Sequence, residues 1–282
     1  MKLTWSRFTL DLAEKTHIMG ILNVTPDSFS DGGRHFDRDV AIECGLRMVE
    51  DGADIIDIGG ESTRPGADPL PLEEELRRTL PVIEALAKSV SVPISIDTYK
   101  ADVAQRALDA GASMVNDISG LRFDAGMAKT IAHYKVPVVV MHIKGTPKNM
   151  QADPVYDALI PEIIEYLRGS IRIAMEAGIG EDMIVVDPGI GFGKTFDHNL
   201  EILKNLDAFT MLGKPLLVGP SRKAFLGRIL GNAAPSERVE GTAAAVAISI
   251  MNGANMVRVH DVKEMARVAK VADAIKRGII SV

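Results

Sequence analysis

Cysteine, basic charge and long apolar runs are all scarce in this 282-residue sequence. The single cysteine, Cys44, excludes an intrachain disulfide and a cysteine cage for a metal, as is typical of the reducing cytoplasm. Lys and Arg total 32 against 38 Asp and Glu, a net charge of −6 that argues against nucleic-acid binding. The longest apolar stretch, residues 243–251, is about half of what a bilayer crossing needs, and charges interrupt residues 1–15, where a secretory signal would lie. We therefore expect a cytoplasmic protein without nucleic-acid or membrane partners.

Short apolar runs alternate with longer amphipathic stretches along the chain. The runs are rich in Ile, Val, Met and Gly, as in strands covered on both faces, and span 17–23, 54–60, 93–98, 114–119, 137–142, 184–189, 215–221 and 256–261. Between them lie helix-like segments such as 40–49, 72–89 and 101–110, several of which end at a glycine. This order predicts an α/β fold, a (β/α)8 TIM barrel, with a doubly wound open sheet as the alternative. We expect one domain over residues 1–282, in which residues 1–12 form an N-terminal extension, a short hairpin closing the barrel floor.

Polar and charged residues stand where the apolar runs end. They are Asn23, Glu61 to Arg64, Asp97, Asn116, Asp117, His142, Asp187, Ser221 to Lys223, Arg258, His260 and Asp261. In a barrel these strand ends share one rim, the face that carries active sites. The alternative is that they cap the following helices, which suits Asp, Asn and Ser but leaves Arg and His unexplained.

Two long polar loops follow the first two runs, at residues 24–36 and 61–71, and are candidate lids or disordered surface loops.

A third segment, DPGIGFGKT at 187–195, superficially resembles a nucleotide-binding loop. It has one residue too few for a P-loop, and Lys194 stands where the dinucleotide motif needs its third glycine. We reject both nucleotide interpretations. The glycines instead predict close approach of backbone to a flat ligand, with Phe192 at its edge.

No protein-built zinc site is expected, because the six histidines lack metal-ligand spacing. Magnesium needs only one or two protein oxygens together with substrate phosphates, and Asn23 is a suitable single ligand. No nucleophile with an adjacent base is evident, and Cys44 falls in the first predicted helix as a small core residue.

Two chemistries meet at the predicted rim. Asp97, Asn116 and Asp187 suit a ligand rich in N–H donors, since a carboxylate can accept two parallel hydrogen bonds. Lys223, Arg258 and His260 come from the last two repeats, where barrels often bind phosphate. The pairing predicts a heterocyclic ligand that carries phosphate or pyrophosphate.

Several segments together closely resemble one family. They are ILNVTPDSFSDGG at 21–33, DIGGESTRPGA at 57–67, NDI at 116–118, MHIKGTP at 141–147, DPGIGFGK at 187–194, SRK at 221–223 and RVHD at 258–261. In this order they resemble the dihydropteroate synthase family. The resemblance implies a TIM-barrel homodimer that joins 6-hydroxymethyl-7,8-dihydropterin pyrophosphate to 4-aminobenzoate, releasing pyrophosphate and making 7,8-dihydropteroate with Mg²⁺ in folate biosynthesis. Sulfonamides, which mimic aminobenzoate, are expected inhibitors.

The resemblance also assigns roles to residues of this chain. For the pterin it implies Asp97, Asn116, Ile118, Met141, Asp187, Phe192, Gly219 and Lys223. For pyrophosphate it implies Asn23, partly through the metal, with Thr63, Arg64, Arg258 and His260. For aminobenzoate it implies Phe29, Thr63, Pro65, Ser221 and Lys223. The catalytic set is then Asp97, Lys223, Arg258 and His260.

A dissociative, SN1-like displacement fits these residues. Loss of pyrophosphate leaves a cationic methylene conjugated with the pterin, so the protein must stabilise the departing anion. The aryl amine is neutral near pH 7 and needs no strong base. Two alternatives remain: a pterin-dependent methyltransferase, which would need neither the anion pocket nor the loop with Thr63 and Arg64, and a non-catalytic pterin-binding homologue.

Overall fold

A parallel sheet of eight strands forms the centre of the protein in the computed structural model, which describes residues 1–25 and 38–278. The strands follow the spatial order β8, β7, β6, β5, β4, β3, β10, β9. Their bounds are β3 (His17–Asn23), β4 (Ile55–Gly59), β5 (Ile94–Asp97), β6 (Met114–Asp117), β7 (Val138–Met141), β8 (Ile184–Asp187), β9 (Leu217–Val218) and β10 (Met256–Val259). Each lies within one of the eight predicted apolar runs.

The sheet closes on itself between its first and last strands. An isolated parallel bridge pairs Val186 of β8 with Leu216, the residue before β9, and Val186 N donates to Pro215 O at 2.9 Å. Closure distinguishes a barrel from the doubly wound open sheet. The prediction of a TIM barrel is confirmed.

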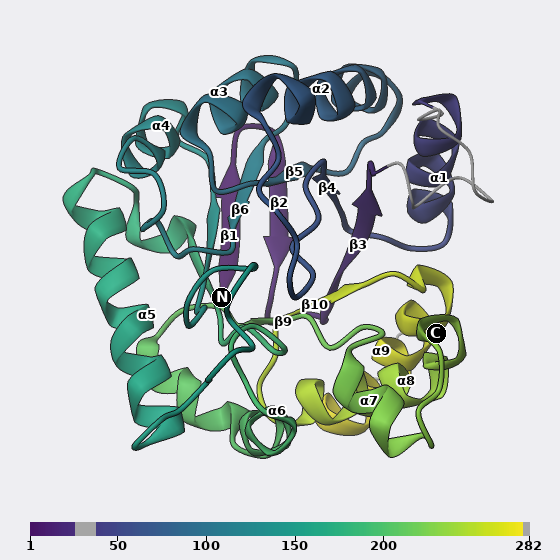
Figure 1. Ribbon diagram of the computed structural model, residues 1–282. Coiled ribbons are helices and arrows are strands. Elements are labelled where there is room, and N and C mark those ends of the chain that lie inside the picture. Colours follow the sequence, from purple (N-terminus) through teal and green to yellow (C-terminus); the bar gives the residue numbers. More distant parts are fainter. Residues whose placement is uncertain (26–37, 279–282) are drawn as a thin grey trace.

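Helices surround the strands as an outer ring (Figure 1). They are α1 (Arg38–Glu50), α2 (Leu72–Ser89), α3 (Ala101–Asp109), α4 (Met127–Tyr134), α5 (Leu159–Glu176), α6 (Phe196–Lys204), α7 (Ala224–Ile229), α8 (Val239–Met251) and α9 (Val262–Arg277), with 3-10 turns η2 (Glu181–Met183), η3 (Leu206–Leu212) and η4 (Pro235–Glu237). Cys44 lies in α1 as predicted, partly buried against the core. None of the described helices is long and apolar enough to cross a membrane.

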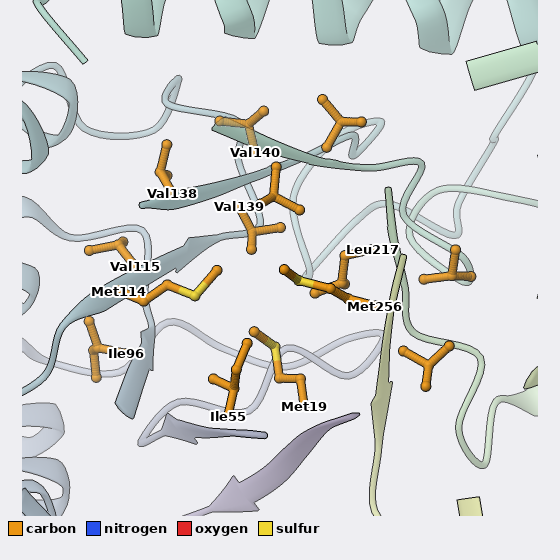
Figure 2. Close-up of a cluster of buried hydrophobic side chains, with 14 of the residues drawn as sticks. Met19, Ile55, Ile96, Met114, Val115, Val138, Val139, Val140, Leu217 and Met256 are labelled. Atoms are coloured by element: carbon orange, nitrogen blue, oxygen red, sulfur yellow. The ribbon is translucent and has the colours of Figure 1, made fainter. Parts of the chain in front are cut away.

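Side chains rather than a channel fill the barrel. Met19, Ile55, Met114 and Met256 are fully buried and gather inside the ring of strands in Figure 2. Strands between two layers of apolar side chains need Ile and Val on both faces, which explains the nearly unbroken apolar runs.

The N-terminal extension forms the predicted hairpin. β1 (Lys2–Trp5) pairs antiparallel with β2 (Phe8–Asp11), and in Figure 1 the pair lies across the middle of the ring of helices. Leu3 and Leu10 are buried in the core, and β1 contacts η2, which immediately precedes β8. The hairpin therefore covers the floor, at the amino-terminal ends of the strands.

Candidate active site

The carboxyl-terminal ends of the strands bring charged residues from opposite sides of the sequence together. Arg258, on β10, places Nε 2.6 Å from Asp57 Oδ2 on β4 and Nη2 2.7 Å from Asp97 Oδ2 on β5. Asn116 Nδ2, on β6, donates to the same Asp57 oxygen at 3.0 Å. These contacts bring the predicted residues Asp97, Asn116 and Arg258 into one cluster.

Helix capping does not explain the polar rim at the last two repeats. Asp261, just before α9, could accept a capping bond but forms no side-chain cap hydrogen bond, and Lys223, just before α7, has no acceptor with which to cap. Their neighbours instead pair with one another across the rim, as described below for Ser221 and His260. The polar side chains here bond to one another across the rim and not to the helix ends.

Burial sets the protonation of this cluster. It raises the pKa of Asp97 to about 7, although the Arg258 charge opposes the rise, and it raises the pKa of Asp187 to about 6. Burial, followed by the nearby Arg258 charge, lowers the pKa of Lys223 to about 8. The pKa of Arg258 is raised by Asp57 and Asp97 against the opposing effect of burial, so it stays charged. Near neutral pH the two carboxyls and the amine are poised between charge states.

The loop after β8 forms one wall of the site. Gly189 N donates to Asp187 Oδ1 at 2.7 Å, and Lys223 Nζ lies 4.2 Å from the centroid of the Phe192 ring. Next to this wall is a small apolar cluster, separate from the main core, formed by Ile118, Met141, Ile143 and Met150 with Tyr99 and Phe192 packed against it. Gly219 lies beside Arg258, whose Cβ is 3.7 Å from where a Gly219 Cβ would be. Carboxylates, an amine and an apolar cluster suit a flat, donor-rich heterocycle.

Replacing Gly189 by alanine is expected to destabilise the fold. Gly189 has a φ of 72°, and an added Cβ would lie 2.0 Å from His142 O. Gly231→Ala is the matched control, since Gly231 has a φ of 73° and nothing within 4 Å of its Cβ position. Both variants bear the left-handed strain of about 1–2 kcal/mol, and Gly189→Ala should lose about 1–3 kcal/mol more through overpacking. Urea unfolding measures the difference, and equal losses would contradict the close approach.

Ser221 holds the imidazole of His260. Ser221 Oγ accepts from His260 N at 3.1 Å and lies 3.0 Å from His260 Nδ1. When the hydroxyl donates its hydrogen to Nδ1, the ring proton lies on Nε2. Burial lowers the pKa of His260 to about 3, so the ring is a neutral donor.

Arg222 sits between Ser221 and Lys223 in a strained backbone conformation, with a φ of 56°. Its N donates to Thr242 Oγ1 at 3.1 Å, and its side chain pairs with Asp261 at 3.0 Å and by a second, shorter contact. Such strain persists where surrounding contacts over-determine it, which is common at functional sites. The turn ties the segment after β9 to the end of β10.

The loop after β4 is anchored at both ends. Glu61 accepts from Tyr99 Oη at 2.6 Å and from Lys100 Nζ at 2.5 Å, while Gly66 N donates to Pro147 O at 3.0 Å. Between these anchors lie three predicted site residues, the half-buried Thr63 and the exposed Arg64 and Pro65. The loop is thus held at the rim, next to the loop after β7.

Asn23 ends β3 half-buried at the same rim, opposite Gly59 in register. In residues 1–25 and 38–278 no three His, Cys, Asp or Glu residues gather as a metal site. The carboxamide oxygen of Asn23 is a hard donor. A single such oxygen, together with oxygens of the substrate, suits Mg²⁺. Phe29, predicted to frame aminobenzoate, lies outside the described residues.

Two residues of the site were missed by the sequence reasoning. Asp57 is fully buried and accepts from both Asn116 and Arg258. The available signal was a lone carboxylate inside the apolar run IIDIG, since a buried charge requires a partner. The second, Lys194, stood in the rejected nucleotide-loop motif and is 2% exposed.

Comparisons with known proteins agree with this geometry. The family described as "Pterin binding enzyme" matches residues 19–260. A dihydropteroate synthase from Synechocystis sp. is 50% identical over 267 residues, covering 95% of this chain and 92% of that protein. The Yersinia pestis dihydropteroate synthase, solved with a sulfonamide drug, has a TM-score of 0.93 at 45% identity and covers 98% of this chain and 100% of its own.

A third relative adds a ligand. The Xanthomonas albilineans dihydropteroate synthase, solved with 7,8-dihydropteroate, has a TM-score of 0.89 at 40% identity over 98% of this chain and 99% of its own. The family match spans most of the sequence and includes the strand ends that carry the charged cluster. The chain therefore belongs to the dihydropteroate synthases, a family of pterin-binding transferases.

Proposed function

We propose that this protein condenses 6-hydroxymethyl-7,8-dihydropterin pyrophosphate with 4-aminobenzoate to give 7,8-dihydropteroate and pyrophosphate in folate biosynthesis. The observation that carries the proposal is the buried cluster in which Asp57 and Asp97 pair with Arg258 and Asn116 donates to Asp57. The carboxylates of this cluster can accept hydrogen bonds from a donor-rich ring, and Arg258 can stabilise an anionic leaving group. The 7,8-dihydropteroate bound to the Xanthomonas albilineans relative contains such a donor-rich ring.

The pterin occupies the acidic half of the site. Asp97, Asn116 and Asp187 accept its ring N–H groups, and a carboxylate can take two of them in parallel. Ile118, Met141, Phe192 and Gly219 line its faces, with Lys223 close to the Phe192 ring. Asp97, when ionised, also favours positive charge on the reacting pterin.

Bond breaking takes place at the basic half. The carbon–oxygen bond cleaves with its electron pair leaving on pyrophosphate, which Arg258 and the Nε2–H of His260 stabilise. Thr63 and Arg64 reach this anion from the loop after β4, and Asn23 would be the protein ligand of the metal. Mg²⁺, when bound, would supply further positive charge to the departing anion.

The aminobenzoate then attacks the cationic methylene through its amine nitrogen and releases a proton. Thr63, Pro65, Lys223 and Ser221 frame it at the rim, with Ser221 acting through the imidazole that it holds. The family resemblance assigns Phe29, which lies outside the described residues, to the same substrate. No strong base is needed, because the amine is neutral. Although Ser221 and His260 lie within hydrogen-bond distance, the reaction therefore needs neither a protein nucleophile nor a general base.

The test is a mixture of the purified protein with dihydropterin pyrophosphate, 4-aminobenzoate and Mg²⁺, in which pyrophosphate and dihydropteroate are both measured. We expect equal amounts of each, inhibition by a sulfonamide that 4-aminobenzoate relieves, and loss of activity with a chelator. Pterin binding without product would instead favour a non-catalytic homologue, and methyl transfer from a methylated pterin would favour the methyltransferase.

The pH dependence of kcat/KM for the pterin substrate is expected to be bell-shaped. Recognition needs ionised Asp187 and Asp97, whose pKa values are about 6 and about 7, and protonated Lys223, whose pKa is about 8. Activity should thus fall below the carboxyl values and above the lysine value. Asp187→Asn should remove its part of the acid limb; a flat profile across this range would contradict the assignment.

The stability of the ligand-free protein should also depend on pH. The raised pKa of Asp97 stabilises the folded state below the ordinary carboxyl value of 3.8, and this contribution to the unfolding free energy is lost as pH rises through about 7.

We also propose a cytoplasmic homodimer formed through the last helices. Four large apolar side chains of α8 and α9 are exposed by 47–71%: Ile248, Met251, Val271 and Ile275. Three of these, all except Ile248, line a groove of about 430 Å³ with Ala247, Arg267, Val268 and Ala272. Such a patch on a helical face marks an interface.

Val271→Asp combined with Ile275→Asp is expected to convert the dimer to a monomer in sedimentation experiments. Desolvating two carboxylates in an apolar interface costs more than the contact supplies. Met211→Asp, an exposed residue of η3, is the matched control and should leave the mass unchanged. A parent protein that sediments as a monomer would overturn the proposal.

A further inference from the structure

Lys194 is a buried amine that the proposed mechanism leaves without a role. It lies in the loop after β8 and is 2% exposed. Its Nζ lies 2.7 Å from His142 Nδ1, 3.0 Å from Phe192 O and 3.3 Å from His142 O. The two carbonyls can only accept, so the amine donates to both, and its contact with Nδ1 is satisfied whichever partner carries the proton.

These contacts join two loops of the site behind its inner surface. His142 follows β7, whereas Phe192 belongs to the loop after β8, so one amine ties both loops together. The amine also lies against the turn that supports Asp187, because a Cβ on Gly189 would be 3.2 Å from Nζ. A second brace runs parallel to it, where Tyr156 Oη donates to Gly193 O at 2.6 Å.

We infer that Lys194 is a positioning residue for the pterin substrate, which it serves by fixing the backbone of Phe192 and the Gly189 turn. Phe192 and Asp187 are assigned to the pterin alone, and Gly189 N donates to Asp187 Oδ1, so a shift of this loop moves two groups that face the pterin and not the aminobenzoate. This inference rests on the proposed function. It adds that the pterin half of the site, and not the aminobenzoate half, depends on Lys194.

The barrel offers a matched control at its opposite end. Lys214 is also buried, 8% exposed, and its Nζ bonds to Glu181 O at 2.8 Å and to the Glu181 carboxylate at 2.9 Å. It precedes β9 at the amino-terminal side of the strands, far from the rim. Lys214→Met therefore reports the cost of losing a buried lysine without touching the site.

The experiment compares Lys194→Met, Lys214→Met and the parent in direct binding of dihydropterin pyrophosphate and in steady-state kinetics. We expect both variants to lower the melting temperature. Lys194→Met alone should raise the dissociation constant for the pterin substrate by about 10-fold or more, the scale of losing one hydrogen bond to a charged group such as Asp187. The KM for 4-aminobenzoate at saturating pterin should stay within about 2-fold.

Unchanged pterin affinity in folded Lys194→Met, or an equal loss in Lys214→Met, would overturn the inference. If Lys194→Met does not fold, Lys194→Gln keeps two N–H donors and is measured in the same way. An intermediate pterin dissociation constant with an unchanged KM for 4-aminobenzoate is expected for it, and equal weakening for both substrates would count against a pterin-specific role. Failure of the parent to bind pterin would instead refute the proposed function.

Discussion

Replacing Arg258 by alanine is expected to lower kcat by about 10²-fold or more, the effect of removing one group that stabilises developing charge. Arg258 is the charged group that the two carboxylates Asp57 and Asp97 hold in place at the centre of the site. Without it, the leaving pyrophosphate loses its fixed cation. Initial rates of pyrophosphate release at saturating substrates measure the effect.

A second arginine provides a closely matched control. Arg277 Nε pairs with Asp273 at 3.1 Å on the last turn of α9, with side chains 18% and 12% exposed, against 19% and 10% for Arg258 and Asp97. Arg277→Ala breaks a comparable half-buried pair far from the rim and should lower the melting temperature while sparing kcat. A folded Arg258→Ala protein with the parent's rate would eliminate the role assigned to Arg258.

Asp57→Asn is expected to cost about 3–5 kcal/mol of unfolding free energy, the range seen when one partner of a buried ion pair is removed. Asp57 is fully buried, and its Oδ2 accepts from both Arg258 and Asn116. The amide cannot neutralise the guanidinium, which then depends on Asp97 alone. Urea unfolding of the ligand-free protein measures the change, and pterin affinity should fall with it.

Asp54→Asn is the comparison for this variant, since Asp54 lies just before the same strand and is itself paired. Its carboxylate accepts from Ile18 N at 2.9 Å and bonds to Lys15 at 2.5 Å, but its side chain remains 17% exposed. Water can replace part of what is lost there, so we expect a smaller cost, about 1 kcal/mol. Similar losses for the two variants would show that Asp57 is not the buried partner of Arg258.

Much of the barrel could be predicted from local pattern. The helix predicted over residues 72–89 has the observed bounds of α2, because Pro71 precedes it and its apolar residues recur along one face. The strand predicted over 215–221 is longer than β9, which spans only Leu217–Val218. Pro215 and Pro220 flank it and have no N–H to donate to a ladder, so pairing is confined to the residues between them.

The site could be predicted only where one residue type at a strand end already suggests a chemistry. Asp97, Asp187 and Arg258 satisfied that condition. Asp57 did not, because its importance comes from a partner 201 residues away in sequence, and no local period connects the two. The roles assigned to individual residues, the metal and the single-domain division stay predictions.

The contact between β8 and β9 that closes the barrel determines how the enzyme loses activity when it begins to unfold. β8 and the two-residue β9 meet through an isolated bridge, whereas the other neighbouring strands share regular ladders. Local unfolding starts where backbone pairing is sparse. Opening at this contact parts Asp187 from Lys223 while the rest of the barrel keeps its hydrogen bonds. Gentle heating should thus yield a population that retains its helices, no longer binds substrate and regains activity on cooling.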